Sequence, residues 1–202
     1  PRLVAAIRAE IEAAPGRRIT FARFMERALT EPGLGYYATS ALRPTREGDF
    51  LTAPELHPFF GRCIGRLLTR AWERMGEPGR FTVREWGAGR GTLARTVADG
   101  LAADGSGLAR ALAWEPIDLP GRHAPAPSGP FRGVVLANEY LDALPVHRLE
   151  QRGGRLVERW VTWRDGWFAE TAGEPSGPEP AAILAADGVT LAEGQLAEVW
   201  PA

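Results

Sequence analysis

The chain has 202 residues and a single cysteine, Cys63, which is enough sequence for one ordinary domain but excludes an internal disulfide and a cysteine cluster for zinc. Its formal net charge of −1 gives no general attraction to nucleic acid or anionic lipid, although it contains many arginines and no lysine. No apolar run approaches about twenty residues and no export signal pattern is visible, so we expect a cytoplasmic protein without a membrane span.

The first thirty residues are predicted to form two helices. Leu3, Ile7 and Ile11 recur at a four-residue spacing, which favours a helix that ends at Pro15. Thr20 has the side chain of a typical N-cap and precedes a second apolar pattern with helical spacing. We therefore expect a helical segment at this end of the chain.

A polar segment with two acids, residues 48–58, precedes the next predicted helix at 59–72. Loops beside helix starts often carry function, so Asp49 and Glu55 are candidates for one wall of a site. The alternative is that Glu55 only helps the helix to begin. Their spacing does not decide between the two.

The segment from Val83 to Leu93 is the most informative part of the chain. It places Gly87, Gly89 and Gly91 between a short apolar run and a helix-like continuation. This pattern predicts a strand, a tight loop and a helix, because glycine allows positive φ and close approach of the backbone to a ligand. The unpaired N–H groups of the helix start favour a nucleotide-like cofactor there.

The acid Glu85 distinguishes between cofactors. It stands two residues before Gly87, and the spacing G-x-G-x-G differs from the G-x-G-x-x-G of dinucleotide enzymes. A carboxylate at the strand end would repel a pyrophosphate and attract the cationic aminoacyl end of S-adenosylmethionine. The alternative is a glycine-rich turn in an unrelated α/β protein.

Downstream of the loop, helix and strand patterns alternate. A helix at 93–101 and a short strand at 111–117 precede the apolar run Gly133–Ala137, which is typical of a strand buried on both faces. Asn138–Asp142 directly follows this predicted strand and so lies at its carboxyl end, where open parallel sheets bind ligands. The remaining residues are predicted to form a hairpin around Asp165 and Gly166 and a linker over 171–180.

Five segments of the chain together resemble the MidA-like family. In chain order they are Ile19–Met25, Gly33–Tyr37, Gly48–Glu55, Glu85–Leu93 and Ala137–His147. Members of that family are S-adenosylmethionine-dependent methyltransferases related to the mitochondrial assembly factor that methylates an arginine of a respiratory complex I subunit. The resemblance covers nearly the whole chain, and it corresponds to the N-terminal half or so of a usual member.

The resemblance implies an α/β fold with a Rossmann-like class I methyltransferase sheet, a helical N-terminal extension and a β-hairpin insertion. We expect three consecutive segments: a helical cap with a substrate-side loop at 1–75, a cofactor-binding core at 76–150, and the hairpin insertion with a linker at 151–202. The family carries more residues than the interval from Gly91 to Trp114 provides, and further strands beyond residue 202. We therefore expect an incomplete sheet over these residues and a longer polypeptide.

The resemblance also implies two sets of site residues. The cofactor-binding set comprises Glu85, Gly87, Ala88, Gly89, Gly91, Thr92, Glu115 and Asp118. Within it, Glu115 substitutes for the ribose-binding acid that the family carries at the end of its second strand. The catalytic set comprises Asn138, Glu139, Asp142, Asp49 and Glu55. The three scattered histidines give no reason to expect a metal.

Glu139 and Asp142 are expected to hold a substrate arginine, because carboxylates bind a guanidinium in a bidentate manner and orient its nitrogen. Acids are also favoured in a first helical turn for structural reasons alone. The expected partner is a protein substrate, for which the resemblance points to a respiratory-complex subunit, and a homodimer is a further expectation. The alternatives are a small-molecule methyltransferase of a biosynthetic pathway and a non-catalytic assembly factor.

Overall fold

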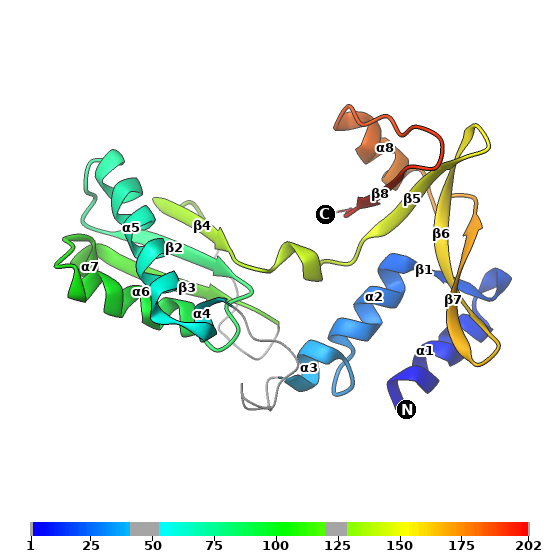
Figure 1. Cartoon of the computed structure of the whole chain (residues 1–202), viewed down its shortest axis with the longest axis horizontal. Helices are drawn as coiled ribbons and strands as arrows, with labels where there is room; N and C mark the ends of the chain where they lie inside the picture. The colour runs from blue at the N-terminus through cyan, green and yellow to red at the C-terminus, as the bar shows by residue number, and fades with distance from the viewer. Residues whose placement is uncertain (1, 41–52, 120–128, 202) are drawn as a thin grey trace. The chain divides into compact units, whose positions relative to one another are not determined.

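The structure is a computed structural model that describes residues 2–40, 53–119 and 129–201, and it divides into two compact units (Figure 1). One unit is the continuous stretch Ser40–Asp142, and the other combines Pro1–Thr39 with Ala143–Ala202. Each unit has its own sheet and its own core.

This division differs from the three consecutive segments that the sequence predicted. Residues 18–20 pair with residues 160–162 in one antiparallel sheet, so the two ends of the chain belong to the same unit. The fourth and fifth helices, which the sequence assigned to a cap, belong instead to the unit with the glycine loop. Pairing across so long an interval leaves no local trace in the sequence.

The Ser40–Asp142 unit contains a parallel sheet of three strands among its described residues. The strands are β2 (Phe81–Trp86), β3 (Leu112–Ile117) and β4 (Gly133–Ala137), in the order β3-β2-β4. In the observed register Glu85 lies beside Pro116 on one side and Leu136 on the other. The predicted α/β class is confirmed, and the carboxyl ends of all three strands meet at one edge.

Helices cover one face of this sheet. They are α4 (Ala53–Leu56), α5 (Pro58–Arg74), α6 (Thr92–Ala103) and α7 (Leu108–Ala111). Alternate residues of the central strand, Phe81 and Val83, are fully buried in one cluster with Val97 and Leu101 of α6. Residues two positions apart along β2 and residues four positions apart along α6 therefore pack in the same core.

The strand β4 is covered on one face only. Val134 and Leu136 pack on the helix-side cluster, whereas Val135 is 60% exposed. The prediction of burial on both faces is therefore wrong for this strand. A continuous apolar run does not say which face is covered, because a single helix layer needs only alternate residues of the strand.

Close packing of α5 on α6 depends on glycine. A Cβ atom on Gly61 would lie 2.2 Å from Thr96 Oγ1 and 2.7 Å from the carbonyl carbon of Thr96. At Gly65, one turn further along α5, the nearest atom is Leu101 Cδ2 at 3.4 Å, which is ordinary contact. Only the first of these two positions excludes a side chain.

The other unit contains an antiparallel sheet. Its strands are β1 (Arg18–Thr20), β5 (His147–Arg152), β6 (Arg155–Arg164), β7 (Trp167–Gly173) and β8 (Leu196–Val199). The long strand β6 pairs with β7, with β5 and with β1, and β8 adds to β5. Asp165 and Gly166, both with positive φ, join β6 to β7, so the predicted hairpin is confirmed. The predicted linker is shorter than expected, since β7 reaches Gly173 and a helix begins at Glu179.

Helices and short 3₁₀ turns complete this unit. They are α1 (Arg2–Ala13), η1 (Pro15–Arg17), α2 (Phe21–Thr30), α3 (Tyr36–Ser40), η2 (Leu141–Ala143) and α8 (Glu179–Ala186), of which α3 and η2 lie at its boundaries. The two predicted N-terminal helices are confirmed: Ile7 and Ile11 are buried with Ile19 and Val161. Thr20 is the N-cap of α2, and its Oγ1 accepts from the amide of Arg23 at 3.1 Å.

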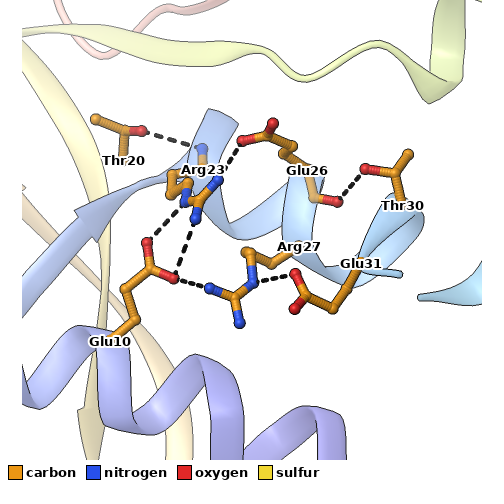
Figure 2. A network of polar contacts seen from close by, with 7 residues as sticks. All are labelled: Glu10, Thr20, Arg23, Glu26, Arg27, Thr30 and Glu31. Carbon is orange, nitrogen blue, oxygen red and sulfur yellow. Dashed lines mark hydrogen bonds and ion pairs between the residues drawn. The ribbon is translucent and has the colours of Figure 1, made fainter. Parts of the chain in front are cut away.

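A polar network ties α1 to α2 (Figure 2). The carboxylate of Glu10 accepts from Arg23 Nε at 2.7 Å and also binds Arg27. The same two arginines pair with Glu26 and Glu31 of the α2 region. Hydrogen bonds to Glu10 and Glu26 raise the pKa of the Arg23 guanidinium.

The two glycines of α5 provide a matched test of the α5–α6 contact. We expect Gly61→Ala to lower the free energy of unfolding by about 1–3 kcal/mol, because the new methyl group overlaps Thr96. Gly65→Ala should be neutral or stabilising by up to about 1 kcal/mol, because alanine is the better helix former and finds room. Urea denaturation measures both, and equal effects of the two substitutions would contradict the observed packing.

Candidate cofactor and acceptor site

The glycine loop follows β2 at the carboxyl edge of the parallel sheet. Gly87, Gly89 and Gly91 adopt φ values of 72°, 54° and 70°, which other residues rarely adopt. The amides of Gly87 and Ala88 donate to the carbonyl oxygen of Ile117 at 2.9 and 3.1 Å. The loop is therefore anchored to the end of β3, and its conformation favours glycine at all three positions.

The loop leads directly into α6. Gly91 is its N-cap in the left-handed conformation, and Thr92 is the first helical residue. The first bond within the helix runs from the amide of Arg95 to the carbonyl oxygen of Gly91 at 3.2 Å. The amides of the first turn therefore project from the end of α6 that carries the loop, which is the arrangement expected of a ligand-binding helix start.

Glu85 lies on the helix-covered face of β2, close to the loop. It is 3% exposed, and its Oε2 accepts a hydrogen bond from Trp114 Nε1 at 2.7 Å. A buried carboxyl group is costly unless it is hydrogen-bonded, so the indole N–H stabilises Glu85 in this position. Trp114 was not among the residues predicted for the site. Its position in the strand that pairs with β2 is the signal that could have found it.

Asp118 and Glu115, the two acids predicted near β3, occupy different places. Asp118 follows the strand, and its Oδ2 accepts from the amide of Gly89 at 2.6 Å. Glu115 lies within the strand, where it pairs with Arg84 at 3.0 Å. The structure thus brings Asp118 to the glycine loop and holds Glu115 in an ion pair. The ribose-binding role of Glu115 stays a prediction.

A second segment, Asn138–Asp142, leaves the sheet on the other side of the loop. It follows β4, whose last residue, Ala137, is paired with Trp86 immediately before Gly87. Glu139 is exposed with a φ of 49°, an uncommon value for a residue with a side chain. Asp142 is exposed in η2. The carboxyl edge of the sheet therefore brings the glycine loop and the predicted acceptor segment side by side.

The remaining catalytic predictions fall in or before α4. Glu55 is half-buried on α4, which packs against α5 and α6. Asp49 lies outside the described residues. His57 has a local structural role, because its Nδ1 accepts from the amide of Phe59 at 3.0 Å and caps α5. The participation of Glu55 in the site stays a prediction.

Two kinds of feature are absent from the residues that the structure describes. No group of three or more histidine, cysteine, aspartate or glutamate side chains is arranged to hold a metal ion. In the same residues, no helix has both the length and the apolar character needed to cross a membrane.

Residues 98–202, just over half of the chain, match a family described as S-adenosyl-L-methionine-dependent methyltransferases. The chain belongs to this family. It is 34% identical over 179 residues to the protein arginine methyltransferase NDUFAF7 homolog, mitochondrial, of Drosophila melanogaster, and 39% identical over 75 residues to NDUFAF7 of Homo sapiens. These matches cover 69% and 37% of the chain, and 40% and 17% of the two relatives.

Two crystal structures of COG1565 superfamily proteins from Burkholderia thailandensis are also similar. One, with S-adenosyl-homocysteine bound, is 35% identical with a TM-score of 0.78, and the other is 34% identical with a TM-score of 0.71. Each match covers 98% of the chain and 56% or 54% of the crystallised protein. The chain thus spans about half the length of the relatives that it matches. The resemblance to MidA-like methyltransferases inferred from the motifs is confirmed.

The positive φ of Glu139 can be tested without any ligand. We expect Glu139→Gly to be more stable than Glu139→Ala by about 1 kcal/mol, because only glycine adopts this φ without strain. Both variants remove the carboxylate, so their difference isolates the backbone term. Thermal unfolding followed by circular dichroism measures it. A glycine variant no more stable than the alanine variant would mean that Glu139 is unstrained.

Proposed function

We propose that the chain is the cofactor-binding part of an S-adenosylmethionine-dependent methyltransferase. The observation that carries the proposal is the glycine loop at the carboxyl end of β2, between Asp118 on one side and Asn138–Asp142 on the other. Membership of the methyltransferase family and the likeness to a protein with S-adenosyl-homocysteine bound support it.

The surroundings of Gly89 favour a ligand at this point of the loop. Among the residues that the structure describes, a Cβ atom built there has no neighbour nearer than the carbonyl oxygen of Gly87, at 4.0 Å, so these residues leave the space beside it open. Acids lie close by, since Asp118 binds the amide of Gly89 and Glu85 is buried just before the loop. Negative charge suits a cationic sulfonium and aminoacyl group better than a pyrophosphate.

The acceptor segment would supply positioning and charge. Methyl transfer needs the acceptor nitrogen in line with the S–CH₃ bond; the bonding pair returns to sulfur, and the nitrogen afterwards loses a proton. Glu139 and Asp142 can bind a guanidinium and localise its positive charge away from the attacking nitrogen. The names of the NDUFAF7 relatives support a protein arginine as the acceptor.

Two alternatives to methylation of a protein arginine are compatible with the same site. An uncharged small molecule is the alternative substrate, and it would not need the two carboxylates. A non-catalytic assembly factor would keep the fold without turnover. The respiratory-complex substrate, the homodimer and the cytoplasmic location expected from the sequence stay predictions.

Substitution of Gly89 tests the cofactor site. We expect Gly89→Val to weaken binding of S-adenosyl-homocysteine at least about tenfold, measured by titration calorimetry, because the side chain enters the open space beside the loop. Gly105→Val is the matched control. Gly105 also has positive φ, at 65°, and its Cβ position has no neighbour within 4 Å in the described part of the chain, but it lies beyond the opposite end of α6. Unchanged affinity in a folded Gly89 variant would overturn the assignment of the loop.

Removal of the two acceptor charges tests the substrate class. We expect Glu139→Gln and Asp142→Asn each to lower methylation of protein arginine at least about tenfold, since each removes a charged hydrogen bond of about 1.5–3 kcal/mol. S-adenosyl-homocysteine affinity should stay within about threefold. Transfer of a labelled methyl group into cell extract, followed by mass spectrometry, gives the readout. Asp99→Asn, on the exposed side of α6, serves as the control.

Labelled product only in an uncharged small molecule would favour the biosynthetic alternative. Cofactor binding with no labelled product in any fraction would favour the assembly factor.

A further inference from the structure

Tyr140 fills the space beside Gly87. A Cβ atom on Gly87 would lie 2.8 Å from Tyr140 Cδ2, 3.3 Å from its Cβ and 3.4 Å from its Cγ. Because the contact includes the base of the side chain as well as the ring, rotation of the ring alone would not relieve it. The ring also lies near Trp86, with centroids 5.9 Å apart and planes inclined at 44°. Glycine is therefore favoured at position 87 for two reasons: a side chain there would overlap Tyr140, and the φ of 72° is one that other residues rarely adopt.

This contact links the two halves of the site. The glycine loop is already held from the β3 side by the bonds of Gly87 and Ala88 to Ile117 and of Gly89 to Asp118. Tyr140 approaches the loop from the β4 side, in the middle of the segment that carries Glu139 and Asp142. Loss of its ring would therefore release the acceptor segment and leave the loop anchored.

We propose that Tyr140 is a positioning residue that sets the acceptor segment Asn138–Asp142 against the cofactor loop through its packing on Gly87. The proposal rests on the proposed methyltransferase function for its consequence, and on the Gly87 contact alone for its structural part. Because a displacement of about 1 Å between reacting groups can cost about a hundredfold in rate, the ring would act on turnover rather than on cofactor affinity.

The structural part is tested in the ligand-free protein. Gly87 and Gly91 have nearly equal φ, 72° and 70°, but a Cβ atom on Gly91 meets none of the described residues within 4 Å. Gly87→Ala should therefore lower the midpoint of thermal unfolding by at least about 3 °C more than Gly91→Ala does. In a Tyr140→Ala background, which removes the ring and keeps Cβ, this excess should become smaller, because the nearest contact, to Cδ2, is lost while the one to Cβ stays. If the excess is absent in the wild-type background, or is unchanged without the ring, the contact does not exist as described.

The functional part is tested by hydrogen exchange with S-adenosyl-homocysteine as the probe. In the wild type, the probe should slow amide exchange in both 87–91 and 138–142. In Tyr140→Ala, we expect protection of 87–91 to survive and protection of 138–142 to fall at least about fivefold, while Tyr140→Phe, which keeps the ring, behaves as wild type. Tyr140→Leu provides the same comparison if the alanine variant unfolds.

The outcomes separate the two claims. Failure of S-adenosyl-homocysteine to bind the wild type would overturn the proposed function but leave the unfolding experiment as a test of the contact. Binding with unchanged protection of 138–142 in Tyr140→Ala and Tyr140→Leu would overturn the positioning role alone. In turnover assays the role predicts a lower kcat with an unchanged KM for the cofactor, restored by Tyr140→Phe. A general loss of stability would not lower kcat while leaving the KM for the cofactor unchanged.

Discussion

The anchoring of the glycine loop to β3 is the constraint on which the site depends. Two loop amides share the carbonyl oxygen of Ile117, and the amide of Gly89 donates to Asp118. All three bonds require β3 to run parallel to β2 with Ile117 beside Trp86. A slip of one residue would turn each β3 side chain to the other face and move the carbonyl away from the loop. The loop conformation and the open space at Gly89 therefore both follow from one strand pairing.

Features of the site that arise from local chemistry could be predicted from the sequence. The positive φ of the three loop glycines, the cap at Thr20 and the hairpin at Asp165 depend on residues a few positions apart. The contacts that complete the site could not be predicted, because Trp114 reaches Glu85 and Asp118 reaches Gly89 across 29 residues of sequence. Such contacts exist only once the order and register of the strands are known.

The motif Ala137–His147 is continuous in the sequence but contributes residues to both compact units of the structure. Its first part, through Asp142, follows β4 beside the glycine loop, whereas His147 begins β5 of the antiparallel sheet. There His147 Nδ1 lies 2.8 Å from Oε1 of the fully buried Glu158, whose Oε2 accepts from the amide of Ser176 at 2.5 Å. Since a buried carboxyl group needs such partners, His147 has a structural role in its own sheet.

Two glycines of the loop, Gly87 and Gly89, lack a side chain for different reasons. At Gly87 the missing side chain makes room for Tyr140 of the same protein, whereas at Gly89 it leaves space that the described protein does not fill. Acids stand at or just beyond the carboxyl ends of the three strands: Glu85 near the end of β2, Asp118 after β3, and Glu139 after β4. The amides of Gly87, Ala88 and Gly89 donate to the end of β3 and to Asp118 rather than to a phosphate as in dinucleotide-binding loops, and the acids nearby are negatively charged groups. A pyrophosphate would meet repulsion from each strand, and a sulfonium would meet attraction, so the charge around the loop rather than its backbone shape supports S-adenosylmethionine as the ligand.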